Sequence, residues 1–427
     1  MAPRDPAPPV TGSPPVHTRR ESCRACGASG LVCILDLGLQ PLANAFLKSP
    51  ADFPAERRFP LALYFCPGCG LVQLIDVIDP EVLFGHYVYV TGTSETMAEH
   101  SRVYAGTVAE LLRLGSTDLV VEIASNDGSL LTWFRQRGSR VLGIEPARNI
   151  AELARARGIP TESIFFDEPQ GKALRARHGP ARAVLANNVL AHVDDPGGFL
   201  RGARDLLADD GLLCVEVPYL GEMLERLEYD TVYHEHLSYF SLGALLRLCE
   251  AAGLRVVRVD RLPVHGGSIR LYAAPVGRNA SHDSEVLTQL AGEERAGLQE
   301  VGRLRRFGEE VARSRELLRD LLGRLTAQGR RLAAYGAPAK GNTLLNYCEI
   351  GVEQLPFTVD QNPLKVGTFT PGMHLPVLPV SALLEQRRDA VVILAWNFAE
   401  EIMRQQSEFL RQGGSFILPL PEPRILS

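Results

Sequence analysis

The densest group of titratable side chains in this sequence lies in four consecutive residues, Tyr233, His234, Glu235 and His236. A histidine can take up a proton near neutral pH, and a neighbouring carboxylate or phenol can orient the ring or hydrogen-bond an oxyanion. On a strand, His234 and His236 would share one face while Glu235 pointed away, whereas in a helix the four side chains would not converge. A catalytic group, a metal site and a polar surface turn are the alternatives for this cluster.

Four cysteines near the N-terminus have the spacing of a metal site. Cys23 and Cys26 form one Cys-x-x-Cys pair, Cys66 and Cys69 form another, and a glycine follows each pair. Four thiolates from two such turns bind Zn²⁺ tetrahedrally and leave no open position, so we predict a structural zinc site. Four unrelated cysteines, or a redox pair, are the alternatives.

The stretch from residue 119 to residue 131 is typical of a buried parallel strand, a tight turn and the start of a helix. This arrangement exposes backbone N–H groups at the carboxyl edge of a sheet, where open α/β sheets bind nucleotides. A second apolar strand ends in Glu145, at the distance of about 20 residues where a carboxylate accepts the ribose hydroxyls. The candidate cofactor-binding residues in and around the turn are Glu122, Ala124, Ser125, Asn126, Asp127 and Gly128.

This turn fits S-adenosylmethionine (AdoMet) better than a dinucleotide. A dinucleotide loop needs the pattern GxGxxG, and here Gly128 is the single glycine of the loop. Asn126 and Asp127 offer side chains that can form hydrogen bonds, and there is no basic residue nearby to offset a phosphate charge. An acidic loop suits a cofactor with a cationic amino-acid tail. An ordinary turn of a strand–helix–strand unit is the alternative.

Other candidate residues lie at predicted strand ends or next to glycines. The strand that starts at Ala181 ends in Asn187, with His192 shortly after it. Lys340 lies in a small-residue loop of a second α/β unit, where it could meet a phosphate, although a solvated lysine is as good an interpretation. His265 precedes two glycines that suggest a close approach to a ligand or a bulge. Tyr87 belongs to an aromatic segment that could line a pocket or simply start a helix.

Composition restricts the class of protein. The chain has 427 residues, a net charge of −5 at pH 7 and eight cysteines. The charge argues against nucleic acid as the main partner, and no apolar run reaches the length of a membrane span. The N-terminus has no apolar signal-peptide region, and with the cysteine content this indicates the reducing cytoplasm. Residues 1–21 are proline-rich, so we predict a disordered leader.

The elements that must position these residues indicate an α/β protein with three parts. We predict a small zinc-binding domain over residues 22–80 and a central doubly wound parallel sheet, which carries the cofactor turn, over residues 81–280. Residues 281–427 would begin with a long amphipathic helical connector and continue as a second α/β unit.

Taken together, these motifs resemble the C-methyltransferases that act on nucleotide-linked deoxysugars. The resemblance covers nearly the whole chain after the leader. It is carried by the two cysteine pairs and by VVEIASNDGSLL, ANNVLAHV, EVPYL, DTVYHEHLSYFS, HGGSIR, YGAPAKGNTLLNY and DQNPLKVGTF, in that order. It implies a zinc-binding domain, a class I AdoMet domain and a C-terminal Rossmann-like domain, with the substrate between the last two. Ala124 stands where the family usually has glycine, which would cost about 1 kcal/mol if the backbone there is left-handed.

The resemblance also implies a reaction and the residues that perform it. The substrate would be a thymidine-diphosphate (TDP) 4-keto-deoxysugar, methylated next to the ketone during antibiotic biosynthesis. His236 would remove the proton, Tyr233 and Glu235 would orient it and hold the oxyanion, and the enolate carbon would attack the AdoMet methyl group. The predicted site residues are His236, Glu235, Tyr233, His192 and Tyr87 for catalysis and Lys340, Asn342 and His265 for substrate.

Three further readings stay open at this stage. The methylated carbon is C-3 by preference, with C-5 as the alternative. A nicotinamide-dependent oxidoreductase acting on nucleotide sugars would also use two Rossmann-like turns, although neither turn carries GxGxxG. A zinc-ribbon interaction protein with a degenerate methyltransferase domain is the third. The family precedent indicates a monomer or a weak homo-oligomer.

Overall fold

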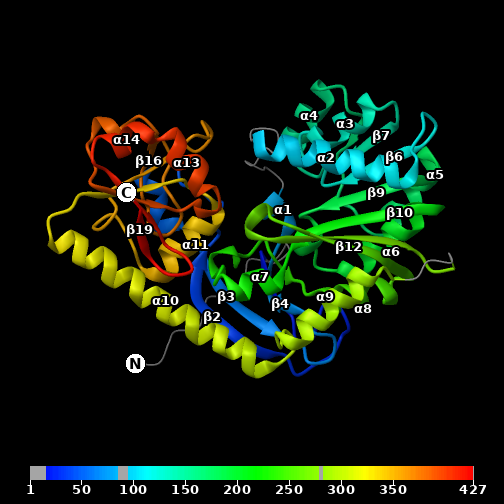
Figure 1. Cartoon of the computed structure of the whole chain (residues 1–427), viewed down its shortest axis with the longest axis horizontal. Helices are drawn as coiled ribbons and strands as arrows, with labels where there is room; N and C mark the ends of the chain where they lie inside the picture. Colours follow the sequence, from blue (N-terminus) through cyan, green and yellow to red (C-terminus); the bar gives the residue numbers. More distant parts are fainter. Residues whose placement is uncertain (1–15, 85–94, 278–281, 427) are drawn as a thin grey trace.

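The computed structural model describes residues 16–84, 95–277 and 282–426. Two α/β units lie at opposite sides of the molecule, and the strands of a smaller N-terminal unit lie between them (Figure 1). The long helix α10 (Val301–Ala327) runs past all three units and joins the central unit to the C-terminal one. Within the described ranges, no helix is long and apolar enough to cross a membrane.

The N-terminal unit is built on a four-stranded antiparallel sheet. A separate pair of short strands, β1 and β5, lies beside it, and β1 falls inside the leader for which we predict disorder. That prediction is wrong for residues 17–19, because backbone pairing with β5 orders them. The elements of this unit are β1 (His17–Arg19), β2 (Val32–Pro41), η1 (Pro50–Ala55), β3 (Arg58–Phe65), β4 (Val72–Leu74), β5 (Asp76–Ile78) and α1 (Pro80–Phe84).

The central unit has a seven-stranded sheet in the order β12-β13-β10-β9-β6-β7-β8. The strands from β10 to β8 are parallel, and β13 runs antiparallel to both of its neighbours. This confirms the doubly wound sheet predicted from the sequence. The strands are β6 (Leu119–Ile123), β7 (Arg140–Ile144), β8 (Thr161–Glu162), β9 (Ala181–Asn187), β10 (Leu207–Pro218), β12 (Leu254–Leu262) and β13 (Ser268–Pro275).

Helices cover both faces of this sheet. Val120 packs into a core with α2 and α3, and its neighbour Val121 packs into the opposite core with α6 and α8. Both side chains are fully buried, which is why the strand is apolar without alternation. The helical elements are α2 (Glu95–Leu112), α3 (Ser129–Gln136), α4 (Arg148–Ala156), α5 (Glu168–His178), η3 (Leu190–His192), α6 (Pro196–Leu206), α7 (Leu220–Glu225), η4 (Tyr229–Thr231), α8 (Leu242–Ala251) and η5 (Val264–Gly266).

The C-terminal unit has a six-stranded sheet in the order β16-β15-β14-β17-β18-β19, parallel except for the pairing of β18 with β19. It is the predicted Rossmann-like unit and has an apolar core of its own. Its elements are β14 (Leu332–Tyr335), α11 (Ala339–Cys348), β15 (Thr358–Asp360), β16 (Val377–Pro379), α12 (Ala382–Glu385), β17 (Ala390–Ile393), η6 (Trp396–Phe398), α13 (Ala399–Gln405), α14 (Ser407–Arg411), β18 (Ser415–Leu418) and β19 (Arg424–Leu426).

The titratable cluster is neither a strand nor a helix. Residues 233–235 form a turn closed by a hydrogen bond from the His236 amide to the Tyr233 carbonyl (2.8 Å). The turn then leads into β11 (Ser238–Tyr239), which pairs with β4 as an edge strand of the N-terminal sheet. A segment inside the predicted methyltransferase range 81–280 therefore belongs by its pairing to the N-terminal unit. The sequence could not show this pairing, because two residues carry no alternation pattern.

The helical connector consists of α9 (Ser284–Arg295) and α10. A buried apolar stripe that includes Leu304, Phe307 and Val311 holds α10 against the other units. At Gly308 the helix approaches β2 so closely that an added Cβ would lie 2.5 Å from the Ile34 carbonyl oxygen. The connector is thus a packed structural element, as its amphipathic pattern predicts.

We expect Gly308→Ala to lower the midpoint of thermal unfolding, because the methyl group would collide with backbone and cost about 1–3 kcal/mol. Gly323→Ala is the matched control in the same helix, because nothing lies within 4 Å of an added Cβ there. Removing a helical glycine at an open position should stabilise by about 0.5–1 kcal/mol. Scanning calorimetry of both variants checks the packing of α10 on β2. Equal midpoints for the two variants would contradict it.

Candidate active site

A cavity of about 1000 Å³ opens at the carboxyl ends of β6, β9 and β10. Its wall contains residues from all three units, including Asn44, Ser125, His236 and Lys340. The volume lies at the upper end of the range for ligand pockets, which suits a cofactor and a substrate bound together. Parallel α/β sheets bind ligands at this edge, so the position agrees with the prediction made from the strand ends.

His236 is fixed in this wall by both of its ring nitrogens. Nδ1 lies 2.9 Å from the Thr231 carbonyl oxygen, which can only accept, so Nδ1 carries the proton and donates. Nε2 then has a lone pair, and the Tyr233 hydroxyl donates to it across 2.8 Å. A neutral imidazole in this tautomer has its basic nitrogen on the side of the Tyr233 hydroxyl. The structure thus brings two of the predicted catalytic residues together at the cavity.

His192 lies beside His236 in the same wall. The two ring centroids are 4.8 Å apart in an edge-to-face arrangement. Burial lowers the pKa of His192 to about 4, against opposing hydrogen bonds to the backbone, so the ring is neutral at pH 7. A neutral neighbour adds no positive charge that would oppose protonation of His236. The backbone amide of Leu237 donates to the Ala191 carbonyl (2.7 Å), which joins the two histidine segments.

The other two members of the cluster do not reach the cavity. His234 is buried against the N-terminal sheet, where Nε2 lies 3.2 Å from the Pro60 carbonyl oxygen. The expectation that it shares a face with His236 is wrong, because a turn rotates successive side chains differently from a strand. Glu235 is also buried outside the cavity wall and accepts a hydrogen bond from the Asn44 amide at 2.7 Å. Asn44, which does line the cavity, therefore lies between Glu235 and the cavity, and the expected part of Glu235 in orienting the base and holding the oxyanion stays a prediction.

The predicted cofactor turn contains three left-handed residues in five. Ala124 has φ +56°, Asn126 has φ +49° and Gly128 has φ +73°. At Gly128 an added Cβ would lie 2.8 Å from Ile159 Cγ1, so only glycine fits this position. Ala124 shows that the position where the family usually has glycine is indeed left-handed, and alanine is strained there.

Glu145 shapes this turn from the neighbouring strand. Its two carboxylate oxygens accept hydrogen bonds from the amides of Asn126 and Ala147, each at 2.9 Å. Burial raises the pKa of Glu145, and these two backbone hydrogen bonds oppose that rise. Each carboxylate oxygen keeps a second lone pair, so the residue can still accept from a ribose hydroxyl.

The residues around the turn fit AdoMet. Oε2 of Glu122, Oγ of Ser125 and Oδ1 of Asn187 are buried polar atoms of the cavity wall that have no hydrogen-bond partner among the described residues. Burial raises the pKa of Glu122 well above its usual value, with nearby carboxylates adding to the rise. Orphaned buried acceptors are costly and are normally satisfied by a ligand or water. A cofactor that carries an ammonium group and hydroxyls would satisfy all three.

One expectation about the turn is wrong. Asp127 is fully buried, and its carboxylate forms an ion pair with Arg157 at 2.8 Å and accepts from the Ser129 hydroxyl at 2.5 Å. A basic residue is therefore close to the loop in space, although it lies 30 positions away in the sequence. Arg157 already compensates the charge of Asp127. Glu122 is therefore the acidic residue near the turn that would interact with the cationic tail of the cofactor.

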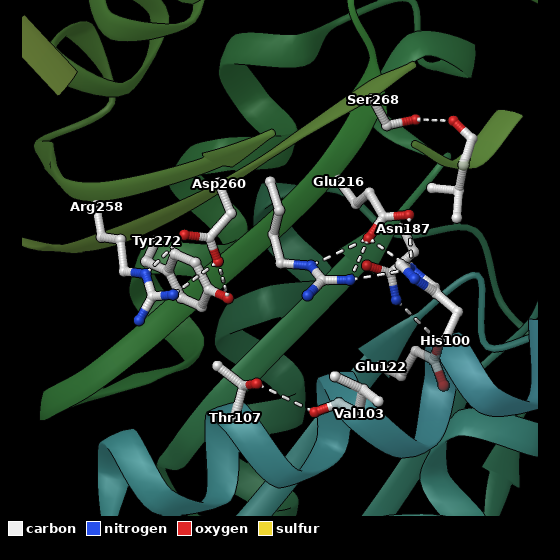
Figure 2. Close-up of polar contacts among 12 residues, drawn as sticks. His100, Val103, Thr107, Glu122, Asn187, Glu216, Arg258, Asp260, Ser268 and Tyr272 are labelled. Atoms are coloured by element: carbon white, nitrogen blue, oxygen red, sulfur yellow. Dashed lines mark hydrogen bonds and ion pairs between the residues drawn. The ribbon is translucent and has the colours of Figure 1, made fainter. Parts of the chain in front are cut away.

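A charged cluster that no sequence motif indicates lies in the cavity wall beside Glu122 and Asn187 (Figure 2). Glu216, at the end of β10, lies between His100 (3.1 Å) and Arg270, and its pKa falls to about 2 through these partners despite burial. The Arg270 guanidinium also stacks on Tyr104 at 3.4 Å. His100 and Glu216 line the cavity, so they join the candidate site. No motif marks them, because they come from a helix and a strand far apart in the sequence.

The C-terminal unit contributes two lysines. Lys340 begins the first turn of α11, contacts the Trp396 ring at 4.3 Å and donates to Asn397. Lys365, which the sequence reasoning missed, donates to the Ala337 carbonyl at 2.8 Å. Burial lowers the pKa of both ammonium groups, and among the described residues neither forms an ion pair within 4 Å. Both line the cavity.

Three predicted site residues remain, and Asn342 is the one whose side chain the structure describes. Asn342 is buried and donates to the Ala43 carbonyl at 2.7 Å, so it joins α11 to the N-terminal unit. It is not among the residues that line the cavity, and its contact with substrate stays a prediction. Tyr87 and the side chain of His265 lie outside the described part of the structure.

The four predicted cysteine ligands converge. Their sulfur atoms all lie within 4.8 Å of one another, with Cys23 3.5 Å from Cys69 and Cys26 3.6 Å from Cys66. Four thiolates around Zn²⁺ at about 2.3 Å would place their sulfurs about 3.8 Å apart, so the cluster fits this ion. The amides of Gly27 and Gly70 donate to the carbonyls of Cys23 and Cys66, which gives the two knuckles the same backbone.

Comparisons with known proteins agree with this division. Residues 23–84 match a family model of a zinc-binding domain, residues 97–259 a methyltransferase domain, and residues 263–421 a C-methyltransferase C-terminal domain. The C-methyltransferase NovU of Streptomyces niveus is 41% identical over 407 residues, which cover 95% of this chain and 97% of NovU. The chain belongs to this C-methyltransferase family.

Solved structures of other methyltransferases each match part of this C-methyltransferase. Magnesium protoporphyrin IX methyltransferase from Synechocystis, with bound S-adenosylhomocysteine, covers 42% of this chain and 84% of its own at 15% identity and a TM-score of 0.33. The CcbJ methyltransferase from Streptomyces caelestis covers 41% and 89% at 15% identity and a TM-score of 0.33. The family models and NovU give methyl transfer as the reaction class, with AdoMet as the cofactor, and the N-terminal domain binds zinc through its four cysteines.

For this C-methyltransferase we expect Ala124→Gly to stabilise the fold, because glycine removes the strain of a left-handed alanine. After the greater chain entropy of glycine is subtracted, the gain should be about 0.5–1 kcal/mol. Ala109→Gly in the last turn of α2 is the control, because glycine replaces alanine there in a helical conformation, and it should lose up to about 1 kcal/mol. Thermal unfolding followed by circular dichroism measures both. A lower midpoint for Ala124→Gly would show that the strain is absent.

Proposed function

We propose that this enzyme methylates a TDP-linked 4-keto-deoxysugar at C-3, next to the ketone, and thereby serves deoxysugar and antibiotic biosynthesis in the cytoplasm. Methylation at C-5 of a related nucleotide sugar is the alternative. The observation that carries the proposal is the position of His236, whose imidazole shares one cavity with the AdoMet turn and with the two lysines of the C-terminal unit.

The chemistry of the carbon explains why such a base is needed. A C–H bond next to a ketone is acidic only when the enolate oxygen is stabilised, so the site needs a base and a donor together. His236 Nε2 accepts the proton from the carbon, while Nδ1 stays bonded to the Thr231 carbonyl and keeps the ring oriented. AdoMet, when bound, supplies the electrophilic methyl group that the carbon takes up.

Tyr233 fits the role of the donor. In the structure its hydroxyl caps Nε2 of His236 at 2.8 Å, so the basic lone pair is occupied. When a sugar enters, rotation of this hydroxyl toward the ketone oxygen would free Nε2 and place a donor on the developing negative charge in one movement. His192 lies beside the base and is neutral, so it adds no positive charge that would oppose protonation of His236.

The diphosphate of the substrate has a suitable place at the C-terminal wall. Lys340 and Lys365 both line the cavity. Each ammonium group donates a hydrogen bond to a neutral oxygen atom, so its positive charge is available to an anion. The helix α11 begins at Ala339, which adds the partial positive charge of a helix N-terminus. This combination supports a nucleoside-diphosphate carrier, and it assigns Lys365 to substrate binding together with the predicted Lys340.

The zinc site has no part in the reaction as proposed. Four thiolates close the coordination sphere, so no position is open to a substrate, and its role is structural. We also propose that residues 22–80, 81–280 and 281–427 form the zinc-binding, AdoMet-binding and substrate-binding domains. Strand β11, which pairs with the N-terminal sheet, is the exception. The enzyme would work as a monomer or a weak homo-oligomer, without nucleic-acid or membrane partners.

Incubation of the enzyme with AdoMet and a TDP-4-keto-2,6-dideoxyhexose should give a product heavier by one methyl group, detected by mass spectrometry. His236→Asn should reduce the rate by at least about a hundredfold, because general-base catalysis contributes about 10²–10⁴. Its affinity for AdoMet, measured by calorimetry, should not change. His178→Asn is the control, since that histidine is paired with Glu162 on the protein surface.

The outcomes separate the alternatives. Nuclear magnetic resonance of the product distinguishes methylation at C-3 from methylation at C-5. If no keto-sugar nucleotide in a panel gains a methyl group, the substrate class is wrong. If His236→Asn retains full activity, another group removes the proton. If the protein binds NADH and shows no affinity for AdoMet, the oxidoreductase reading replaces this one.

A further inference from the structure

We propose that a clamp of two arginines on Asp194 makes the zinc-binding domain a working part of the active site. The clamp consists of Arg20, Arg24 and Asp194. It positions the segment that carries His192, and with it the neighbouring catalytic turn. The domain would then determine the catalytic rate as well as the stability of the fold.

The clamp starts inside the first zinc knuckle. Arg24 lies between Cys23 and Cys26, and its Nη1 donates to Oδ1 of Asp194 at 2.8 Å. Arg20 donates to the other carboxylate oxygen at 2.8 Å. The Arg24 side chain is fully buried, whereas that of Asp194 is 42% exposed and lines the cavity. A buried guanidinium requires its partner, so the position of the knuckle and the position of Asp194 depend on each other.

A second connection leads from the same knuckle to the catalytic turn. Gln73, which is fully buried on β4, donates to the Cys23 sulfur at 3.1 Å and accepts from the Arg24 amide at 3.0 Å. Its backbone lies opposite Ser238 of β11 in the sheet. β11 begins two residues after His236. The knuckle therefore contacts the turn through this strand as well as through the clamp.

The two connections meet at the pair of histidine rings. Asp194 follows His192 by two residues, and Leu237, directly after His236, donates to Ala191. Displacement of the knuckle would therefore move both rings relative to the central sheet, which carries the cofactor turn. A misplacement of about 1 Å in an active site can cost about a hundredfold in rate. This makes Arg24 a positioning residue.

Arg24→Lys is the decisive variant, because lysine keeps the charge but cannot contact Asp194 and the Leu74 carbonyl together, as the guanidinium does. We expect kcat to fall at least tenfold, with the bound zinc and the AdoMet Kd unchanged. Arg258→Lys is the matched control, since Arg258 forms a similar two-bond pair with Asp260 on β12, outside the cavity wall. It should keep full activity.

Two measurements separate positioning from a general loss of structure. Hydrogen exchange should become faster in the peptides 190–196 and 231–240 of Arg24→Lys and stay unchanged in the peptides of β14 and β17. In a double-mutant cycle, Arg24→Lys should add little to the loss caused by Asp194→Asn, because both substitutions break the same ion pair. Where Arg24→Lys folds poorly, Asp194→Asn takes its place, because it breaks the clamp at its half-exposed end and leaves the sequence of the knuckle unchanged.

The proposal is overturned if kcat and the local exchange rates stay unchanged, if the activity falls only in step with zinc content, or if the two losses in the cycle multiply. The kinetic arms rest on the proposed sugar methylation, whereas the exchange arm does not. If wild-type enzyme does not methylate the keto-sugar nucleotide but Arg24→Lys still shows the faster exchange in the two peptides, the proposed function is refuted and the clamp is supported.

Discussion

One hydrogen bond, from Nδ1 of His236 to the Thr231 carbonyl, sets the tautomer of the ring that we propose as the base, and all three domains fix the backbone that accepts it. The C-terminal unit reaches this turn through Thr343, whose hydroxyl donates to the Val232 carbonyl at 3.1 Å. The N-terminal sheet reaches it through the contact of His234 with Pro60 and through β11. The central sheet reaches it through η3. A base with a defined lone pair therefore exists only where the three domains meet.

This constraint explains why so many polar groups are buried without serving as ligands. Asp230, next to the turn, accepts from the indole of Trp396 at 2.7 Å, and burial raises its pKa to about 6. Asn342 and Glu235 likewise connect one domain to another. Buried polar groups cost free energy unless they are paired. Their pairing across domain boundaries ties the domains in one arrangement, which holds the base and the cofactor turn at a fixed separation.

The sequence predicted the parts of this design that have local patterns. The cysteine knuckles, the strand before Gly128 and the carboxylate Glu145 follow from spacing and periodicity, and the family motifs located His236. The missed features depend on tertiary contacts. The pairing of Arg157 with Asp127 joins residues 30 positions apart, and the two-residue strand β11 is defined only by its partner. The family resemblance identified the motif DTVYHEHLSYFS around residue 235, but it could not show which side chains of the turn face the cavity.

The central claim is that His236 removes a proton from the carbon next to the ketone, and exchange with solvent tests it without methyl transfer. The enzyme is incubated in deuterium oxide with the keto-sugar nucleotide and S-adenosylhomocysteine, and the proton resonance of that carbon is followed. The account predicts that wild-type enzyme replaces this proton with deuterium faster than a protein-free sample, and that His236→Asn does not. Equal exchange in the two proteins would contradict it.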